Sequence, residues 1–117
     1  MSEPKTLRET VAEKLLALRD IDSFGPHKAS EELVALSSLL ASISKECSDR
    51  RYIYSLKKIQ LLEEHKTAAK ANIYGQGSME FKDLMEAEDY RAATIDMIRS
   101  IKYYLKISEA EFGNMTR

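Results

Sequence analysis

The sequence predicts an all-α protein built around a long antiparallel helical hairpin, with a shorter helix before it. Apolar residues recur at spacings of three and four through most of the chain, which is the period of helices packed on one face. No segment alternates apolar and polar residues over the length of a strand. In the second half, Gly75 and Gly77 interrupt residues that favour helix. Because glycine tolerates the positive φ that often ends a helix, and Ser78 can cap the next one, we expect the hairpin to turn here.

The composition predicts one helical domain spanning residues 1–117, a length that suits a single core. Charged residues make up 32% of the chain and the formal net charge is −1, so net charge alone gives no argument for nucleic-acid binding. The lone cysteine, Cys47, cannot form an internal disulfide, which favours an intracellular location. The N-terminal residues lack the apolar stretch of a signal peptide, and no apolar run reaches the roughly 20 residues that a membrane span needs. We therefore expect a cytoplasmic protein without membrane contact.

The first helix is expected over residues 4–19. Pro4 suits a first turn, where its missing N–H costs nothing, and Glu3 suits the positive end of the helix dipole. The apolar stripe of this helix consists of Leu7, Val11, Leu15 and Leu18. A loop containing Gly25 follows, and the next helix either begins near Pro26 or is capped by Ser30; the sequence leaves both open.

The two long helices of the hairpin are expected over residues 28–73 and 78–111. In the first, one apolar stripe ends at Cys47 and a second, offset stripe follows, so we expect a kink or break near residues 48–50. The second stripe consists of Tyr52, Leu56, Ile59, Leu62, Ala69 and Ile73. The last helix has a main stripe that reaches Phe112 and an additional apolar flank. The flank consists of Met97, Ile101 and Tyr104.

The length of the last helix predicts self-association. An unbroken helix over residues 78–111 would be roughly 50 Å long at ~1.5 Å per residue. A compact domain of this size has a radius of gyration of about 13 Å. We therefore expect the helices to project and to bury their second apolar flank against other copies or a partner. The predicted homo-oligomer interface consists of Ile95, Met97, Ile98, Ile101, Tyr104 and Leu105.

The sequence has few residues that could form a catalytic or metal site. His27 and His65 are far apart and there is no second cysteine, whereas zinc needs about four ligands at characteristic spacings. Cys47 lies on an apolar stripe without a base partner, so we expect a buried structural thiol. The segment around Gly75 and Gly77 has no preceding strand and no following phosphate-binding lysine. We expect a protein that is not an enzyme and that uses no metal or cofactor.

Charge is unevenly distributed on the two sides of the glycines. Residues 50–70 contain six basic residues and two acidic ones, whereas residues 80–89 contain five acidic residues and one lysine. In a hairpin centred on Gln76, these charges pair across the turn, Lys70 with Asp83 and Lys66 with Glu86, and contribute little if exposed. The alternative is a basic surface for phosphates, with tyrosines available for base stacking. The residues alone favour pairing.

One run of residues resembles a known family. Lys66-Thr67-Ala68-Ala69-Lys70-Ala71, followed by Tyr74 and Gly75-Gln76-Gly77, is similar to the UvsY-type recombination mediators of tailed phages. Those proteins have a Lys-x-Ala-x-Lys-Ala run, then a tyrosine and a Gly-x-Gly turn. Upstream, Ser55-Leu56-Lys57-Lys58 is similar to their Ser-Ile-Lys-Lys, with a spacing to the turn that differs by two residues. The resemblance covers residues 55–78.

The resemblance implies a small helical protein that forms ring-like homo-oligomers, binds single-stranded DNA and helps a recombinase displace a single-strand-binding protein. It would act in the host cytoplasm if a phage encodes it. Lys70 matches a DNA-contacting position and Lys66 a neighbouring basic one, while a further basic position is Asn72 here, which lowers the expected affinity. The expected DNA-binding residues are Lys57, Lys58, Lys66, Lys70 and Tyr74.

Two other functions remain open at this point. The extra apolar flank of the last helix is also consistent with a helical protein–protein module, such as a phage-encoded inhibitor or adaptor of a host protein. A virion assembly protein is the other alternative, and it would co-purify with particles. Salt-dependent affinity for single-stranded DNA distinguishes the mediator from both.

Overall fold

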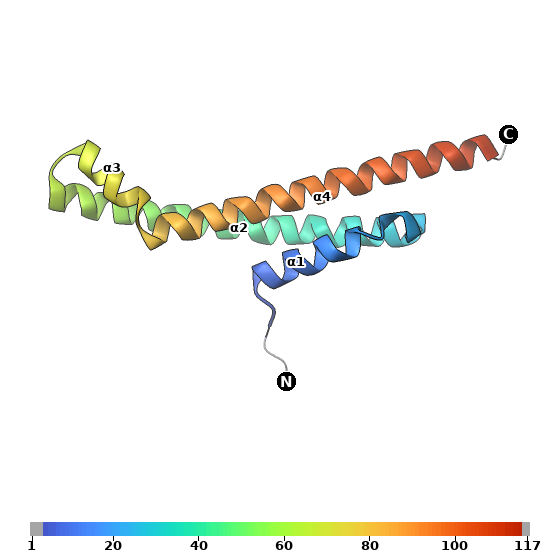
Figure 1. Ribbon diagram of the computed structural model, residues 1–117, viewed down its shortest axis with the longest axis horizontal. Coiled ribbons are helices and arrows are strands. Elements are labelled where there is room, and N and C mark those ends of the chain that lie inside the picture. Colours follow the sequence, from blue (N-terminus) through green and yellow to red (C-terminus); the bar gives the residue numbers. More distant parts are fainter. Residues whose placement is uncertain (1–3, 116–117) are drawn as a thin grey trace. The chain divides into compact units, whose positions relative to one another are not determined.

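The computed structural model describes residues 4–115, with side chains through Glu111. Within these residues it contains helices and no strand, which confirms the all-α prediction (Figure 1). The elements are α1 (Leu7–Leu18), the short 3₁₀ helix η1 (Ile21–Ser23), α2 (Pro26–His65), α3 (Ala68–Gln76) and α4 (Met79–Met115). No helix in this part of the chain is long and apolar enough to cross a membrane. The predicted roles of Glu3 and the Phe112 side chain lie outside the described residues.

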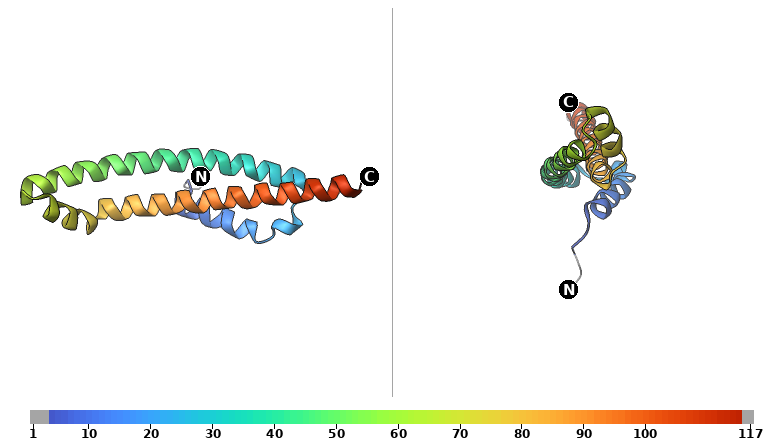
Figure 2. Two further views of the ribbon diagram at one scale, coloured as in Figure 1. Left: turned by 90° about the horizontal axis from the view of Figure 1, so that it is seen from above. Right: turned by 90° about the vertical axis from the view of Figure 1, so that its left-hand side faces the viewer.

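The chain divides into two compact units, each of which contains part of α2 and part of α4. Unit 1 consists of Met1–Ala41 and Ala92–Arg117, and unit 2 consists of Ser42–Arg91. In each unit the segments of α2 and α4 run antiparallel, as the hairpin prediction requires (Figures 1 and 2).

The starts of α1 and α2 follow ordinary capping chemistry. The side-chain oxygen of Thr6 accepts a hydrogen bond from the backbone N–H of Glu9 (3.2 Å), so α1 begins at Leu7. Pro4 therefore precedes the helix, and its predicted first-turn position is wrong because threonine supplies a better cap two residues later. Helix α2 begins at Pro26, which settles the alternative that the sequence left open.

The core of unit 1 forms where α1 and the loop after it pack on the long helices (Figure 2). Its buried side chains include Val11, Phe24, Ala29, Leu36, Met97 and Ile101. Lys14 of α1 forms an ion pair with Glu32 of α2 (2.8 Å), and the Tyr104 hydroxyl donates a hydrogen bond to the carbonyl oxygen of Phe24. These two contacts connect α1 and the loop to both long helices.

Helix α2 continues through residues 48–50, so the predicted break there is wrong. The inner stripe does not end at Cys47: it continues at the same three-four spacing through Arg50, Tyr54, Lys57 and Leu61, all buried or half-buried. This stripe includes an arginine and a lysine, so the run of apolar residues is interrupted although the helix continues. Packing overrides the polarity of single positions on the seam.

Helix α2 instead ends at His65, and the next residue is Lys66. This residue has a φ of 58°, the one positive φ outside glycine in the described chain, and its N–H bonds the carbonyl oxygen of Leu62 (2.8 Å). An α-helix commonly ends in this way, with a residue of positive φ whose N–H bonds the carbonyl oxygen four residues earlier. Thr67 then caps α3, because its side-chain oxygen accepts from the N–H of Lys70 (3.3 Å).

The hairpin does not reverse at the two glycines, as the sequence predicts, but at Lys66 and Thr67, and Gly77 only caps the end of α3. Gly75 lies inside α3 and is buried, and neither Gly75 nor Gly77 has a positive φ. A Cβ at Gly75 would lie 3.3 Å from the hydroxyl oxygen of Tyr54 and 3.5 Å from Cγ of Lys58, so this glycine allows α3 to approach α2 closely. Ser78 caps α4 as predicted, since its hydroxyl oxygen accepts from the N–H of Phe81 (3.2 Å).

The left-handed backbone at Lys66 gives a stability prediction. Glycine adopts this conformation without the steric cost that a side chain adds, although it also raises the conformational entropy of the unfolded chain. Lys66→Gly should therefore raise the free energy of unfolding by about 0.5–1 kcal/mol, measured by urea denaturation. The matched control is Lys70→Gly inside α3, which should lower it by about 1 kcal/mol. An equal decrease for both variants would show that residue 66 is helical.

Candidate functional site

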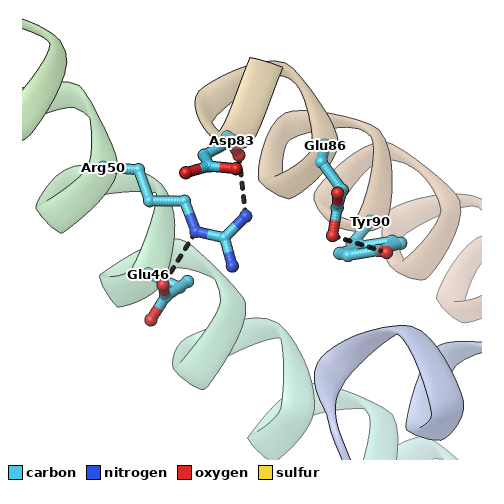
Figure 3. Close-up of polar contacts among 5 residues, drawn as sticks. All are labelled: Glu46, Arg50, Asp83, Glu86 and Tyr90. Atoms are coloured by element: carbon cyan, nitrogen blue, oxygen red, sulfur yellow. Dashed lines mark hydrogen bonds and ion pairs between the residues drawn. The ribbon is translucent and has the colours of Figure 1, made fainter. Parts of the chain in front are cut away.

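Arg50 sets the alignment of α2 and α4 in unit 2. Its Nε donates to Oε1 of Glu46 (2.8 Å), one turn earlier in α2, and its Nη1 donates to the backbone oxygen of Asp83 in α4 (2.7 Å) (Figure 3). Burial lowers the pKa of Arg50, but the hydrogen bond to Glu46 and the nearby carboxylates, including that of Glu86, outweigh it and leave the pKa raised. Arg50 therefore stays charged while it joins the two helices.

The polar contacts from basic residues of α2 to α4 come from its two arginines and not from the lysines near the reversal. Arg51 donates to Oε1 of Glu88 (2.5 Å), and Glu86 accepts from the Tyr90 hydroxyl within α4 (2.9 Å) (Figure 3). In the described part of the chain no ion pair joins Lys70 to Asp83 or Lys66 to Glu86. The predicted pairing is wrong because the chain reverses at Lys66 and Thr67, before α3, and not at Gln76.

The structure places all five expected DNA-binding residues in unit 2, but not on one face. Lys57 and Lys58 are neighbours in α2 and therefore project about 100° apart around the helix. Lys57 is half-buried, whereas Nζ of Lys58 lies 5.2 Å from the centre of the Tyr54 ring. Lys66 and Lys70 are exposed on either side of the Thr67 cap. Lys58, Lys66 and Lys70 have no acidic partner among the described residues.

Two of the three tyrosines near the basic run have rings accessible for base stacking. Tyr74 stacks on His65 (ring centres 4.3 Å apart, planes at 12°) and remains half-exposed. Tyr52 is exposed on α2. Tyr54, in contrast, packs against Phe81 of α4 (ring centres 5.3 Å apart) and belongs to the inner face of the hairpin.

A shallow groove of about 310 Å³ lies between α2 and α3. Its walls are apolar, with Ile59 and Leu62 on one side, Ala68 and Ala71 on the other, and Lys58 as its charged member. The sequence could not predict this groove, because it exists only where the chain turns at Lys66 and folds α3 back.

The outer side of α2 in unit 2 carries a second set of exposed apolar side chains. Tyr52, Leu56 and Ile59 are 66%, 50% and 56% exposed. These are the residues that the sequence assigned to an offset packing stripe. The structure keeps these residues on one side of α2, but no described residue buries them.

The predicted oligomer interface on the last helix is partly occupied by the protein's own core. Met97 and Ile101 are 3% and 0% exposed in unit 1, and Tyr104 bonds the backbone of Phe24. Met97 and Ile101 are therefore wrong as interface residues, because α1 and its loop already cover that flank. The remaining positions are half-buried, and their role at an interface stays a prediction; they are Ile95, Ile98, Tyr104 and Leu105.

Cys47 is a buried thiol, as predicted. Burial raises its pKa, and the negative charge of Glu88 raises it further, against smaller opposing effects of Arg51 and the other nearby arginines. Within the described residues no group of three or more histidine, cysteine, aspartate or glutamate side chains is placed to hold a metal ion.

Comparison of the chain with family models, with curated proteins and with solved structures finds no match.

The raised pKa of Cys47 predicts low reactivity. The thiolate is the reacting form, so a pKa above the ordinary 9.0 leaves less of it at pH 8 than in the unfolded chain. A colorimetric disulfide reagent should therefore react slowly with the native protein and rapidly in urea. The control is Ser48→Cys in a Cys47→Ser background, which places a thiol at the adjacent exposed position and should react rapidly. Equal native rates for the two thiols would contradict the burial of Cys47.

Proposed function

We propose that the protein binds single-stranded DNA as an accessory factor of phage-type recombination, through basic residues around the α2–α3 reversal. The observation that carries the proposal is the charge arrangement of unit 2. Arg51 pairs with Glu88 of α4 and Arg50 bonds the backbone oxygen of Asp83, whereas Lys58, Lys66 and Lys70 have no acidic partner in the described chain. Free lysines attract phosphates and release their bound counterions.

An accessible aromatic ring beside these lysines supports the same function. Tyr74 lies one α3 turn beyond Lys70, and its stack on His65 fixes the ring while half of the side chain remains exposed. A ring held in this way can stack on a nucleic-acid base, a contact worth about 1–3 kcal/mol. Stacking tolerates any base, so the expected binding is independent of sequence.

Affinity for DNA would depend on several copies of the site acting together. Each chain offers few free lysines and has a formal net charge of −1. When copies assemble, each contact repeats along the strand, and the later contacts form at a high effective concentration. Self-association and DNA binding therefore belong to one proposed function, with the recombinase as the expected protein partner.

The second candidate function is a helical protein–protein module. The exposed stripe of Tyr52, Leu56 and Ile59 supports it, since a monomeric protein rarely leaves a contiguous apolar patch uncovered. Absence of DNA affinity at low salt, together with a specific protein partner that a Leu56→Glu variant no longer binds, would favour this function over the first.

The DNA-binding proposal predicts a particular salt dependence. The protein is titrated into a fluorescently labelled single-stranded oligonucleotide, and anisotropy is followed across a salt series. The Lys66→Ala/Lys70→Ala variant should bind more weakly. The slope of log association constant against log salt concentration should become less steep by about 1.4, or ~0.7 for each phosphate that the variant no longer neutralises.

The matched control is Lys102→Ala/Lys106→Ala, which removes the same charge from exposed positions of α4 in unit 1. It should leave the slope unchanged. Failure of the wild-type protein to bind at low salt, or an equal decrease in affinity for the two double variants, would overturn the proposal.

A further inference from the structure

The outer side of α2 in unit 2 has the residue spacing of a helix-pairing seam. Six positions follow one another at intervals of four, three, four, three and four: Lys45, Asp49, Tyr52, Leu56, Ile59 and Glu63. This alternation keeps side chains on one face over several turns and is the pattern of helices that pack along their length. We refer to these six residues as the outer seam.

The outer seam faces away from the inner face that packs on α4. The inner stripe, which includes Ile43, Cys47 and Tyr54, has the same alternation two positions earlier. Two residues correspond to about 200° around an α-helix, so the two seams lie on nearly opposite sides. All six positions of the outer seam are exposed, and Ile53 beside its centre and Leu62 beside its Glu63 end are exposed apolar residues. Helix α2 is therefore built to pack on two sides, and in the described part of the chain the outer seam stays exposed.

We propose that the outer seam binds a second copy of this chain, antiparallel, across a two-fold axis near residue 54. The intervals read the same in both directions, so an antiparallel copy places every seam position opposite another. Tyr52 lies opposite Leu56 of the partner subunit at the centre of the seam. Ile59 lies opposite Asp49 of the partner subunit, and the same contacts repeat on the other side of the axis.

Charge complementarity selects a second antiparallel copy as the occupant. The seam ends in opposite charges, Lys45 and Glu63, and neither has an ion pair among the described residues. In the antiparallel pair Lys45 meets Glu63 of the partner subunit at both ends. A parallel pair would place lysine beside lysine and glutamate beside glutamate, which is repulsive. Asp49 at a seam position weakens the pair but helps to fix its register, as polar residues do in coiled coils.

The interface does not depend on the proposed DNA binding. The expected DNA-binding residues Lys57, Lys58, Lys66 and Lys70 lie outside the outer seam. The dimer can therefore form without nucleic acid, and its presence or absence is measured independently of any DNA affinity.

The first test is the mass of the protein in solution over a range of concentrations, measured by sedimentation equilibrium. The wild-type protein should approach twice the chain mass of 13.3 kDa as concentration rises. Leu56→Glu should raise the dimer dissociation constant at least about tenfold, because two-fold symmetry introduces the buried charge twice. Position 56 is exposed in the single chain, so the variant should keep its helix content and melting behaviour at concentrations where the wild type is monomeric.

The matched control is Ile73→Glu, which makes a similar apolar-to-acidic change at an exposed position of α3 outside the seam. It should dimerise like the wild type. A wild-type protein that stays monomeric at every concentration, or a dimer that Leu56→Glu and Ile73→Glu affect equally, would overturn the proposal.

A charge exchange tests the antiparallel register. Lys45→Glu and Glu63→Lys should each weaken the dimer, and the two substitutions together should restore it, because each end then regains opposite charges. In a parallel dimer each end would keep like charges in every variant, so neither single change would weaken the pair and the double change would restore nothing. That outcome would contradict the antiparallel arrangement.

Discussion

The alignment of α2 and α4 in unit 2 depends on one arginine. Nη1 of Arg50 binds a backbone carbonyl oxygen, that of Asp83, while Nε is held by Glu46. This contact favours the register in which Asp83 lies beside Arg50. The pairs of Arg51 with Glu88 and of Tyr54 with Phe81 belong to the same register. The lysines beyond the arginines, Lys58, Lys66 and Lys70, form no ion pair among the described residues.

Much of the fold could be predicted from the sequence, because it follows from periodicity and capping. The helical class, the hairpin, the Ser78 cap and the burial of Cys47 are all confirmed. The break in α2 was misplaced because Arg50 and Lys57 occupy inner positions, which makes a continuous seam look interrupted. The end of α2 at His65 has no signal in composition, because the next residue, Lys66, has a positive φ that lysine rarely adopts.

The candidate sites were predictable only in part. The sequence shows which lysines and tyrosines are present, but whether each is paired depends on the register of α2 against α4 and on the position of α3. Gly75 was assigned to a turn, whereas its place in α3 reflects the close approach of Tyr54 and Lys58. The outer stripe of α2 was visible as a spacing, yet whether a stripe is covered is a property of the whole fold. Helix α2 thus has two apolar faces: an inner one that packs within the hairpin and an outer one that is exposed.

The most direct test of the register in unit 2 is a double-mutant cycle between Tyr54 and Phe81. The free energy of unfolding is measured for Tyr54→Ala, Phe81→Ala, the double variant and the wild type. The observed ring contact predicts a coupling energy of about 0.5–1.5 kcal/mol between the two positions. Additive effects of the two substitutions, with a coupling near zero, would contradict the register that Arg50 sets.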